Sequence, residues 1–171
     1  WAMAMDNGIQ TDAFVLDFAK AFDSVPHERL KAKLNSYGIC DKTLNWIDGF
    51  LCKRYQRVVV NGTKSNWTRV SSGVPQGTVL GPILFNLFIN DITEGVSSDI
   101  RLFADDCICY RTIRTPEDCK ILQRDISHLA SWAKKWYMDF AHSKCKMIRI
   151  SRKMRHNISH LYQLQDLPLE S

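Results

Sequence analysis

Apolar and polar residues alternate along the first part of the chain in patterns that predict both strands and helices. A continuous apolar run at 13–16 ends on Asp17, so we expect a buried strand that carries a carboxylate at its end. Two helices are predicted next, one over 26–38, between a proline and a glycine, and one that begins with Asp41 as its N-cap.

The middle of the chain predicts two hairpins with a helix between them. A β-branched run at 56–60 stops at Asn61-Gly62, which is typical of a two-residue hairpin turn. Residues 79–92 are apolar almost all round and predict a buried helix. Residues 100–110 hold two apolar runs rich in strand-forming residues, so a second hairpin is expected there.

The last part of the chain predicts a long amphipathic helix and a closing strand. Thr115-Pro116 is a helix start signal, and apolar residues follow it in a 3-4-3-4-3 spacing: Cys119, Leu122, Ile126, Leu129, Ala133 and Trp136. A short strand is expected at 147–150. This order of elements predicts an α+β fold, in which helices pack on one face of an antiparallel sheet and leave the other face free for a substrate.

Composition narrows the class of protein. The chain has 171 residues, 45% of them hydrophobic and 24% charged, which suits one globular domain. No apolar run approaches the roughly 20 residues that span a bilayer, so no membrane partner is expected. The six cysteines show no zinc-site spacing, and the first residues show no signal peptide. We therefore expect free thiols and an intracellular location, in the nucleus or cytoplasm, rather than secretion.

Positive charge is concentrated in one segment. Residues 111–160 carry 12 Lys/Arg and 4 Asp/Glu, whereas residues 1–110 carry 11 Lys/Arg and 12 Asp/Glu. Such a segment favours a polyanion partner such as nucleic acid. A solvated helix face explains the same charge equally well.

Two adjacent carboxylates, Asp105 and Asp106, stand between the apolar runs of the second predicted hairpin. Both can lie at the tip of a tight turn, where their mutual repulsion favours a divalent cation held by oxygen ligands. A solvated turn without chemistry is the alternative. Asp17 could supply a third ligand, since a strand end and a hairpin tip can be neighbours in one sheet. Three such carboxylates would hold two cations and support phosphoryl displacement.

Four stretches of the chain resemble motifs of the reverse transcriptases of non-LTR (LINE-type) retrotransposons, particularly the jockey-like and chicken-repeat-like groups. Residues 16–25 look like the first palm motif, 73–82 like the second, 103–106 (Phe-Ala-Asp-Asp) like the third and 132–146 like the fourth. The motifs follow the family's order and spacing. The resemblance implies a polymerase palm with part of the fingers, and an RNA-directed DNA polymerase that uses an RNA template, a DNA primer, deoxynucleotides and two Mg²⁺ ions, with Mn²⁺ as a substitute.

The resemblance also implies a catalytic centre. Asp17 and Asp105 match the family's two principal metal ligands, and Asp106 matches its second hairpin carboxylate. Phe18 matches a position whose backbone carbonyl helps to hold a metal. These four residues are the expected metal-binding set, and the three aspartates are the expected catalytic residues.

A second group of residues is expected to bind the nucleotide. Phe22 matches the aromatic residue that stacks under the sugar and excludes a 2′-hydroxyl. Pro75, Gln76 and Gly77 belong to the loop that packs against the incoming nucleotide and the template. Lys144 matches a lysine near the triphosphate, which could donate a proton to the pyrophosphate leaving group.

Each of these residues has a structural alternative. Phe22 could be core, Gln76 could satisfy loop backbone, and Lys144 could be surface charge. We interpret Asp23 and Asp91 as structural, the first because aspartates at opposite ends of a turn need not share a metal.

The chain departs from the family pattern in two respects. Ala141 replaces an asparagine of the fourth motif, which predicts an altered local turn and raises the alternative of a catalytically dead copy that at most binds nucleic acid. The chain is expected to be one domain fragment over residues 1–171, without most of the N-terminal fingers and without the thumb.

Overall fold

The computed structural model describes residues 6–152, 157–165 and 167–168. The chain forms two compact units, one of Trp1–Ala19 with Asp91–Ser171 and one of Lys20–Asn90. Within the described ranges, no helix combines the length and the apolar character that crossing a membrane requires.

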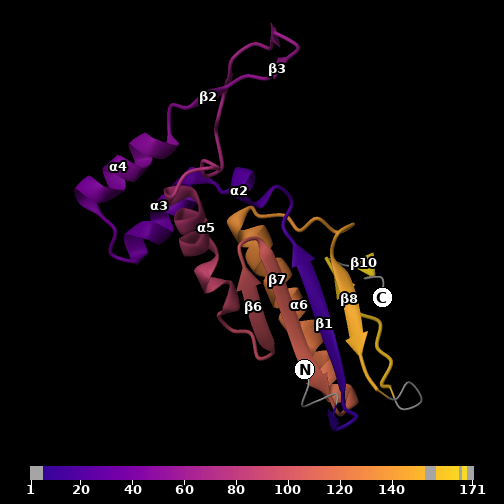
Figure 1. The fold of residues 1–171 in the computed structure, drawn as a ribbon. Coiled ribbons are helices and arrows are strands. Elements are labelled where there is room, and N and C mark those ends of the chain that lie inside the picture. The colour runs from indigo at the N-terminus through magenta and orange to yellow at the C-terminus, as the bar shows by residue number, and fades with distance from the viewer. Residues whose placement is uncertain (1–5, 153–156, 166, 169–171) are drawn as a thin grey trace. The chain divides into compact units, whose positions relative to one another are not determined.

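The first unit is built on a four-stranded antiparallel sheet in the order β6-β7-β1-β8. Its strands are β1 (Gln10–Asp17), β6 (Asp99–Phe103), β7 (Asp106–Ile113) and β8 (Lys146–Ile150). The long helix α6 (Pro116–Trp136) lies along one face of this sheet (Figure 1). The predicted antiparallel sheet with helical cover on one face is therefore confirmed.

The sheet has one buried face because of the alternation along its central strands. Phe14 and Leu16 of β1 are fully buried, and the residues opposite them on β7 are the buried Cys109 and Cys107. Residues one position along point to the other face, where Val15 pairs with Ile108 and both are partly exposed. The helix contributes most of its predicted stripe to the buried face, since Cys119, Leu122, Ile126, Leu129 and Ala133 are all fully buried, whereas Trp136 at the end of the stripe is half-buried.

The start of α6 follows the sequence signal. Thr115 is the N-cap and Pro116 is the first helical residue, while the Asp118 side chain completes a capping box with Thr115.

The cysteines are free thiols, and four of the six are buried: Cys107, Cys109, Cys119 and Cys145.

A buried polar cluster lies at the far end of β1, which sequence reasoning did not predict. The Asp12 carboxylate is fully buried and accepts hydrogen bonds from Arg149 at 3.0 and 3.3 Å, from the Tyr162 hydroxyl at 2.9 Å and from Gln10 Nε2 at 2.9 Å. Burial, together with Asp12, raises the pKa of Tyr162. A strand that begins with polar residues is thus tied to distant parts of the chain.

The second unit contains the helices α2 (Ala21–Ser24), α3 (His27–Ser36), α4 (Asp41–Leu51) and α5 (Leu80–Ile89). A 3-10 turn over Asn90–Thr93 follows α5 where the chain passes into the first unit. The four short strands β2 (Tyr55–Gln56), β3 (Val59–Val60), β4 (Thr63–Lys64) and β5 (Thr68–Arg69) form the predicted hairpin around Asn61-Gly62. Both turn residues have positive φ, which is the reason for the Asn-Gly preference.

Two helix predictions in this unit were wrong in detail. Cys40 is the N-cap of α4, and Asp41 is already the first helical residue. The helix predicted over 79–92 is also not buried all round, since Ile83 is 49% exposed and Val79 is 87% exposed. Hydrophobicity alone did not distinguish its buried side, which carries Leu84, Phe85 and Phe88.

Candidate functional site

The carboxylates of Asp17 and Asp106 belong to directly opposed residues. Asp17 ends β1, Asp106 begins β7, and the two are partners in the antiparallel register. Opposed residues of an antiparallel pair share one face of the sheet. That face is the one away from the buried Leu16 and Cys107, so both carboxylates project where α6 does not cover the strands.

Asp105 lies in the tight turn that connects β6 to β7. Phe103 and Asp106 pair across the turn, which leaves Ala104 and Asp105 as its two central residues. Ala104 has a φ of 52°, a left-handed conformation that suits a two-residue hairpin. The turn therefore brings the third predicted carboxylate next to Asp106, at the same end of the sheet as Asp17.

The backbone after Asp17 is held by the segment that precedes β8. The Ala19 N–H donates to the Asp139 carbonyl at 2.7 Å, and the Ala141 N–H donates to the Asp17 carbonyl at 2.8 Å. These two hydrogen bonds flank the antiparallel β-bridge between Phe18 and Phe140, and the rings of these two residues stack with centroids 4.6 Å apart. The Phe18 carbonyl takes no part in the bridge and points to the opposite edge of its strand, the edge on which β7 lies.

Lys144 and Cys145 approach the same strand end. The Lys144 ammonium lies 3.3 Å from Asp17 Oδ1, and the lysine side chain is 66% exposed against 24% for the aspartate. The Asp17 N–H donates to the Cys145 sulfur at 3.5 Å. Burial raises the pKa of the Cys145 thiol. An exposed cation thus contacts the Asp17 carboxylate, and a buried sulfur contacts the Asp17 backbone.

The turn that contains Ala141 is formed although the family's asparagine is missing. The Ala141 carbonyl accepts hydrogen bonds from the backbone N–H groups of Lys144 at 2.8 Å and Cys145 at 3.1 Å. Backbone groups alone therefore bring Lys144 back towards Asp17. The alanine does not prevent the local fold.

The donors of this site suit a hard divalent cation. Asp17 and Asp106 offer carboxylate oxygens on one face of neighbouring strands, and Asp105 offers a third carboxylate one residue away. Across the described ranges, no three His, Cys, Asp or Glu side chains meet as a ready-made metal-binding group. Asp17 and Asp106, which share a face, and Asp105 in the adjoining turn are the residues that could hold such a cation.

The glycine-rich loop after β5 lies in the second unit and is bound to the start of that unit. The Val74 N–H donates to the Phe22 carbonyl at 2.7 Å, and the Ser72 hydroxyl donates to the Asp23 carbonyl at 2.9 Å. Gln76 is exposed, and its amide donates to the Asp23 carboxylate at 3.1 Å. The loop predicted to meet a nucleotide is thus packed on the segment that carries Phe22.

Phe22 is held in place by α5. It is partly exposed, and its ring stacks on the fully buried Phe85 with centroids 4.5 Å apart. Such a ring is supported on one side and accessible on the other, which suits both a sugar-facing residue and a core residue at the margin.

The end of the loop is joined to α5 by a close backbone approach. Thr78 Oγ1 donates to the Pro75 carbonyl at 2.8 Å and accepts from the Gly81 N–H at 3.0 Å. A β-carbon on Gly81 would collide with the Pro75 carbonyl, so glycine is required there. The conformation of Pro75 and Gln76 therefore depends on this contact, whereas Gly77 supplies a positive φ in open space.

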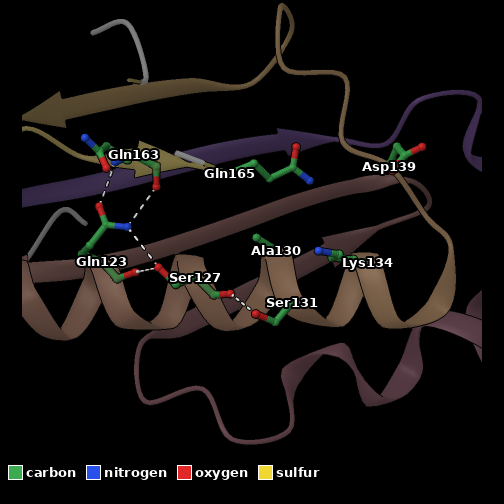
Figure 2. Close-up of a pocket in the computed structure, with 8 residues that line it drawn as sticks. All are labelled: Gln123, Ser127, Ala130, Ser131, Lys134, Asp139, Gln163 and Gln165. Carbon is green, nitrogen blue, oxygen red and sulfur yellow. Dashed lines mark hydrogen bonds between the residues drawn. The ribbon is translucent and has the colours of Figure 1, made fainter. Parts of the chain in front are cut away.

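A polar hollow in the first unit lies between α6 and β9 (Gln163–Leu164), as Figure 2 shows. Gln123 crosses it, accepting from the Gln163 N–H at 2.8 Å and donating to the Gln163 carbonyl at 2.9 Å. None of the predicted catalytic residues lines this hollow. The two hydrogen bonds of Gln123 hold β9 against α6.

Comparison with known proteins places the chain among polymerases. A family model described as "Reverse transcriptase (RNA-dependent DNA polymerase)" matches residues 4–161. A probable RNA-directed DNA polymerase from transposon X-element of Drosophila melanogaster is 29% identical over 89% of this chain and 17% of that protein. The RNA-directed DNA polymerase from mobile element jockey of Drosophila funebris is 29% identical over 82% of the chain and 16% of that protein. The chain thus spans about a sixth of the length of these relatives.

Solved structures with the same fold include telomerase. Telomerase from Candida tropicalis in complex with a fragment of telomeric RNA matches with a TM-score of 0.64 and 12% identity, over 94% of this chain and 30% of that chain. The apo enzyme truncated from its C-terminal domain matches with a TM-score of 0.60 and 15% identity, over 88% of this chain and 32% of that one. These likenesses support the fold, which is that of the palm and fingers of a polymerase.

Proposed function

We propose that this chain, which belongs to the reverse transcriptase family, supplies the catalytic palm of an RNA-directed DNA polymerase of a non-LTR retrotransposon. The resemblance to jockey-type elements is confirmed by the relatives. One observation carries the proposal. Asp17 and Asp106 are opposed across β1 and β7 on the face that α6 leaves uncovered, and Asp105 lies in the adjoining turn.

The proposed reaction is attack by the 3′-hydroxyl of a DNA primer on the α-phosphate of a deoxynucleotide, with pyrophosphate as the leaving group. Asp17, Asp105 and Asp106 would hold two Mg²⁺ ions, with Mn²⁺ as a substitute, and the Phe18 carbonyl would add a ligand. Mg²⁺ held there would activate the primer hydroxyl and neutralise charge on the leaving group. The carboxylates lie on an open sheet face, where a primer end can reach them.

Lys144 has a defined place in this proposal. Its ammonium contacts Asp17 in the absence of substrate. The side chain is mostly exposed and long, so it can turn from the carboxylate to the triphosphate when the cation binds. We propose that it then donates a proton to the departing pyrophosphate.

The second unit would recognise the nucleotide and the template. Phe22 presents a ring backed by Phe85, and we propose that a sugar stacked on this ring would have its 2′-hydroxyl excluded sterically. Pro75, Gln76 and Gly77 form a loop whose backbone is set by the Thr78 and Gly81 contacts. The proposed partners are an RNA template, a DNA primer and deoxynucleotides, and the telomerase of similar fold was itself solved with RNA. Such partners imply action inside the cell, in the nucleus or cytoplasm.

Primer extension tests the proposal. The chain is extended at both ends to the length of its relatives. The extended protein is then mixed with an RNA template, a DNA primer, deoxynucleotides and Mg²⁺. We expect extension that Asp105→Asn reduces by at least about 10³-fold, since metal ligands carry most of the electrostatic catalysis. Asp99→Asn is the matched control, because Asp99 is an exposed aspartate at the start of β6, the end of that strand away from the turn that holds Asp105, and it should retain extension. Absence of extension by the unsubstituted protein would support the alternative of a dead copy.

A further inference from the structure

The hairpin of residues 53–70 projects as a two-stranded ribbon from the second unit, where Figure 1 labels β2 and β3. Every residue from Tyr55 to Arg69 is exposed, including Trp67 at 60%. Five Lys/Arg lie in residues 49–90 and all of them fall in this hairpin, while no Asp or Glu occurs there. We propose that this hairpin, here called the arm, binds single-stranded nucleic acid.

The register of the arm places its cations on one face. Tyr55 is opposite Arg69, and Val59 is opposite Lys64. Arg57 lies between these pairs and contacts Trp67, with the guanidinium carbon 4.5 Å from the ring centroid. Because residues two apart on a strand share a face, one face carries Arg57, Lys64 and Arg69 together with both aromatic rings.

The opposite face of the arm is uncharged. It carries Gln56 opposite Thr68, and Val60 opposite Thr63. Between these pairs the Ser65 N–H donates to the Val58 carbonyl at 2.9 Å. The pairing thus shifts by one residue at Asn66, which forms a bulge in the second strand. The arm is therefore two-faced, with its charge and its rings collected on one side.

The chemistry of the charged face matches a single strand of nucleic acid. Exposed aromatic rings are platforms for unpaired bases, and cations between them contact the phosphates. The guanidinium of Arg57 lies over the Trp67 ring, so a cation and an aromatic platform stand together on this face. The absence of acidic residues from residues 49–90 removes repulsion of a polyanion.

The base of the arm is bound to the glycine-rich loop. The Val70 N–H donates to the Arg54 carbonyl at 2.9 Å, which closes the two strands. The Arg54 guanidinium then donates to the Leu51 carbonyl at 2.7 Å and to the Gly73 carbonyl at 2.8 Å. The His27 ring contacts the same Gly73 carbonyl at 2.8 Å. A nucleic-acid strand bound by the arm would therefore continue onto the loop that is proposed to contact the template.

That the bound single strand is RNA rests on the proposed function. Binding of RNA by the arm can nevertheless be measured without polymerisation. Fluorescence anisotropy of a labelled, unstructured RNA of about 20 nucleotides reports binding to the full chain. Trp67→Ala should weaken binding by about 5- to 150-fold, which corresponds to the loss of one stacked base. Trp46→Ala is the matched control, because Trp46 is 63% exposed on α4 in the same unit.

Two lysine substitutions, compared with each other, test the binding of phosphates by the arm independently. Lys64→Gln should reduce the slope of log affinity against log salt concentration by about 0.7, the value for one phosphate contact with a single strand. Lys42→Gln, on the exposed side of α4, should leave the slope unchanged. The proposal is overturned if Trp67→Ala binds RNA as tightly as Trp46→Ala, or if both lysine variants have the same slope.

The two proposals fail in distinguishable ways. Asp105→Asn should lose extension and keep RNA affinity, because the carboxylate is not part of the arm. If RNA binding depends on Trp67 while the unsubstituted protein never extends a primer, only the polymerase proposal fails. If the protein extends primers and the arm variants bind RNA normally, only the arm proposal fails.

Discussion

Gly73 lies where the glycine-rich loop passes over the backbone of Asp23, and Gly73→Ala measures how close that passage is. The φ of Gly73 is +85°, and a β-carbon there would lie 2.7 Å from both the Cα and the carbonyl oxygen of Asp23. Both neighbours are backbone atoms that cannot rotate away. The left-handed conformation costs an alanine about 1 kcal/mol, and overpacking adds about 1–3 kcal/mol. We therefore expect the free energy of unfolding to fall by about 2–4 kcal/mol.

Gly77→Ala separates the two contributions. Gly77 has a φ of +75°, but no atom lies within 4 Å of the point that a β-carbon would occupy, so only the conformational cost of about 1 kcal/mol applies. Urea unfolding followed by circular dichroism gives both values, provided that the m-values agree. Equal destabilisation by the two substitutions would refute the close approach at Gly73 and, with it, the packing of the loop on Asp23.

Three further predictions concern other contacts. Asp12→Ala should lower the unfolding free energy by about 3–5 kcal/mol in urea, because it leaves the Arg149 guanidinium without its buried partner; a loss below about 1 kcal/mol would contradict the cluster. Burial raises the pKa of Asp118, but hydrogen bonds from the Arg114 and Thr115 N–H groups outweigh it and lower the pKa below 3.8. Because its pKa is lowered on folding, ionised Asp118 stabilises the folded state. This contribution is present above pH 3.8 and is lost as the pH falls through the pKa of the folded protein. Asp118→Asn should therefore cost about 1 kcal/mol near pH 7 and little near pH 2 in thermal melts; a pH-independent cost would count against it. Phe22→Ala should raise ribonucleotide incorporation in the extension assay, and an unchanged sugar preference would show that the ring is core.

Local patterns in the sequence predicted the elements that position the site. The apolar run before Asp17 forms β1, and the apolar runs around Asp105 and Asp106 form the hairpin of β6 and β7. Both depend on neighbours a few residues away. The meeting of Asp17 with Asp106 was expected only because a strand end and a hairpin tip can share a sheet, and the register confirms it.

Contacts between distant residues were the part that local patterns did not reveal. The Asp12 carboxylate is bonded to Tyr162, 150 residues later in the chain, and nothing in the sequence around either residue indicates the other. The Asp17 backbone contacts Cys145, 128 residues away, although the cysteine was expected only as a free thiol. The exposed side of α5 was missed because an apolar helix shows no periodicity from which to infer a face.

Asp17, Asp105 and Asp106 are proposed to hold the divalent cation that nucleotide addition requires. Electron paramagnetic resonance of Mn²⁺ tests it directly, in the presence of primer–template and deoxynucleotide. We predict that bound Mn²⁺ is present in the unsubstituted protein and in Asp99→Asn, and that it is reduced at least about tenfold in Asp17→Asn and Asp105→Asn. Equal Mn²⁺ binding by Asp17→Asn and Asp99→Asn would contradict a cation site at these carboxylates.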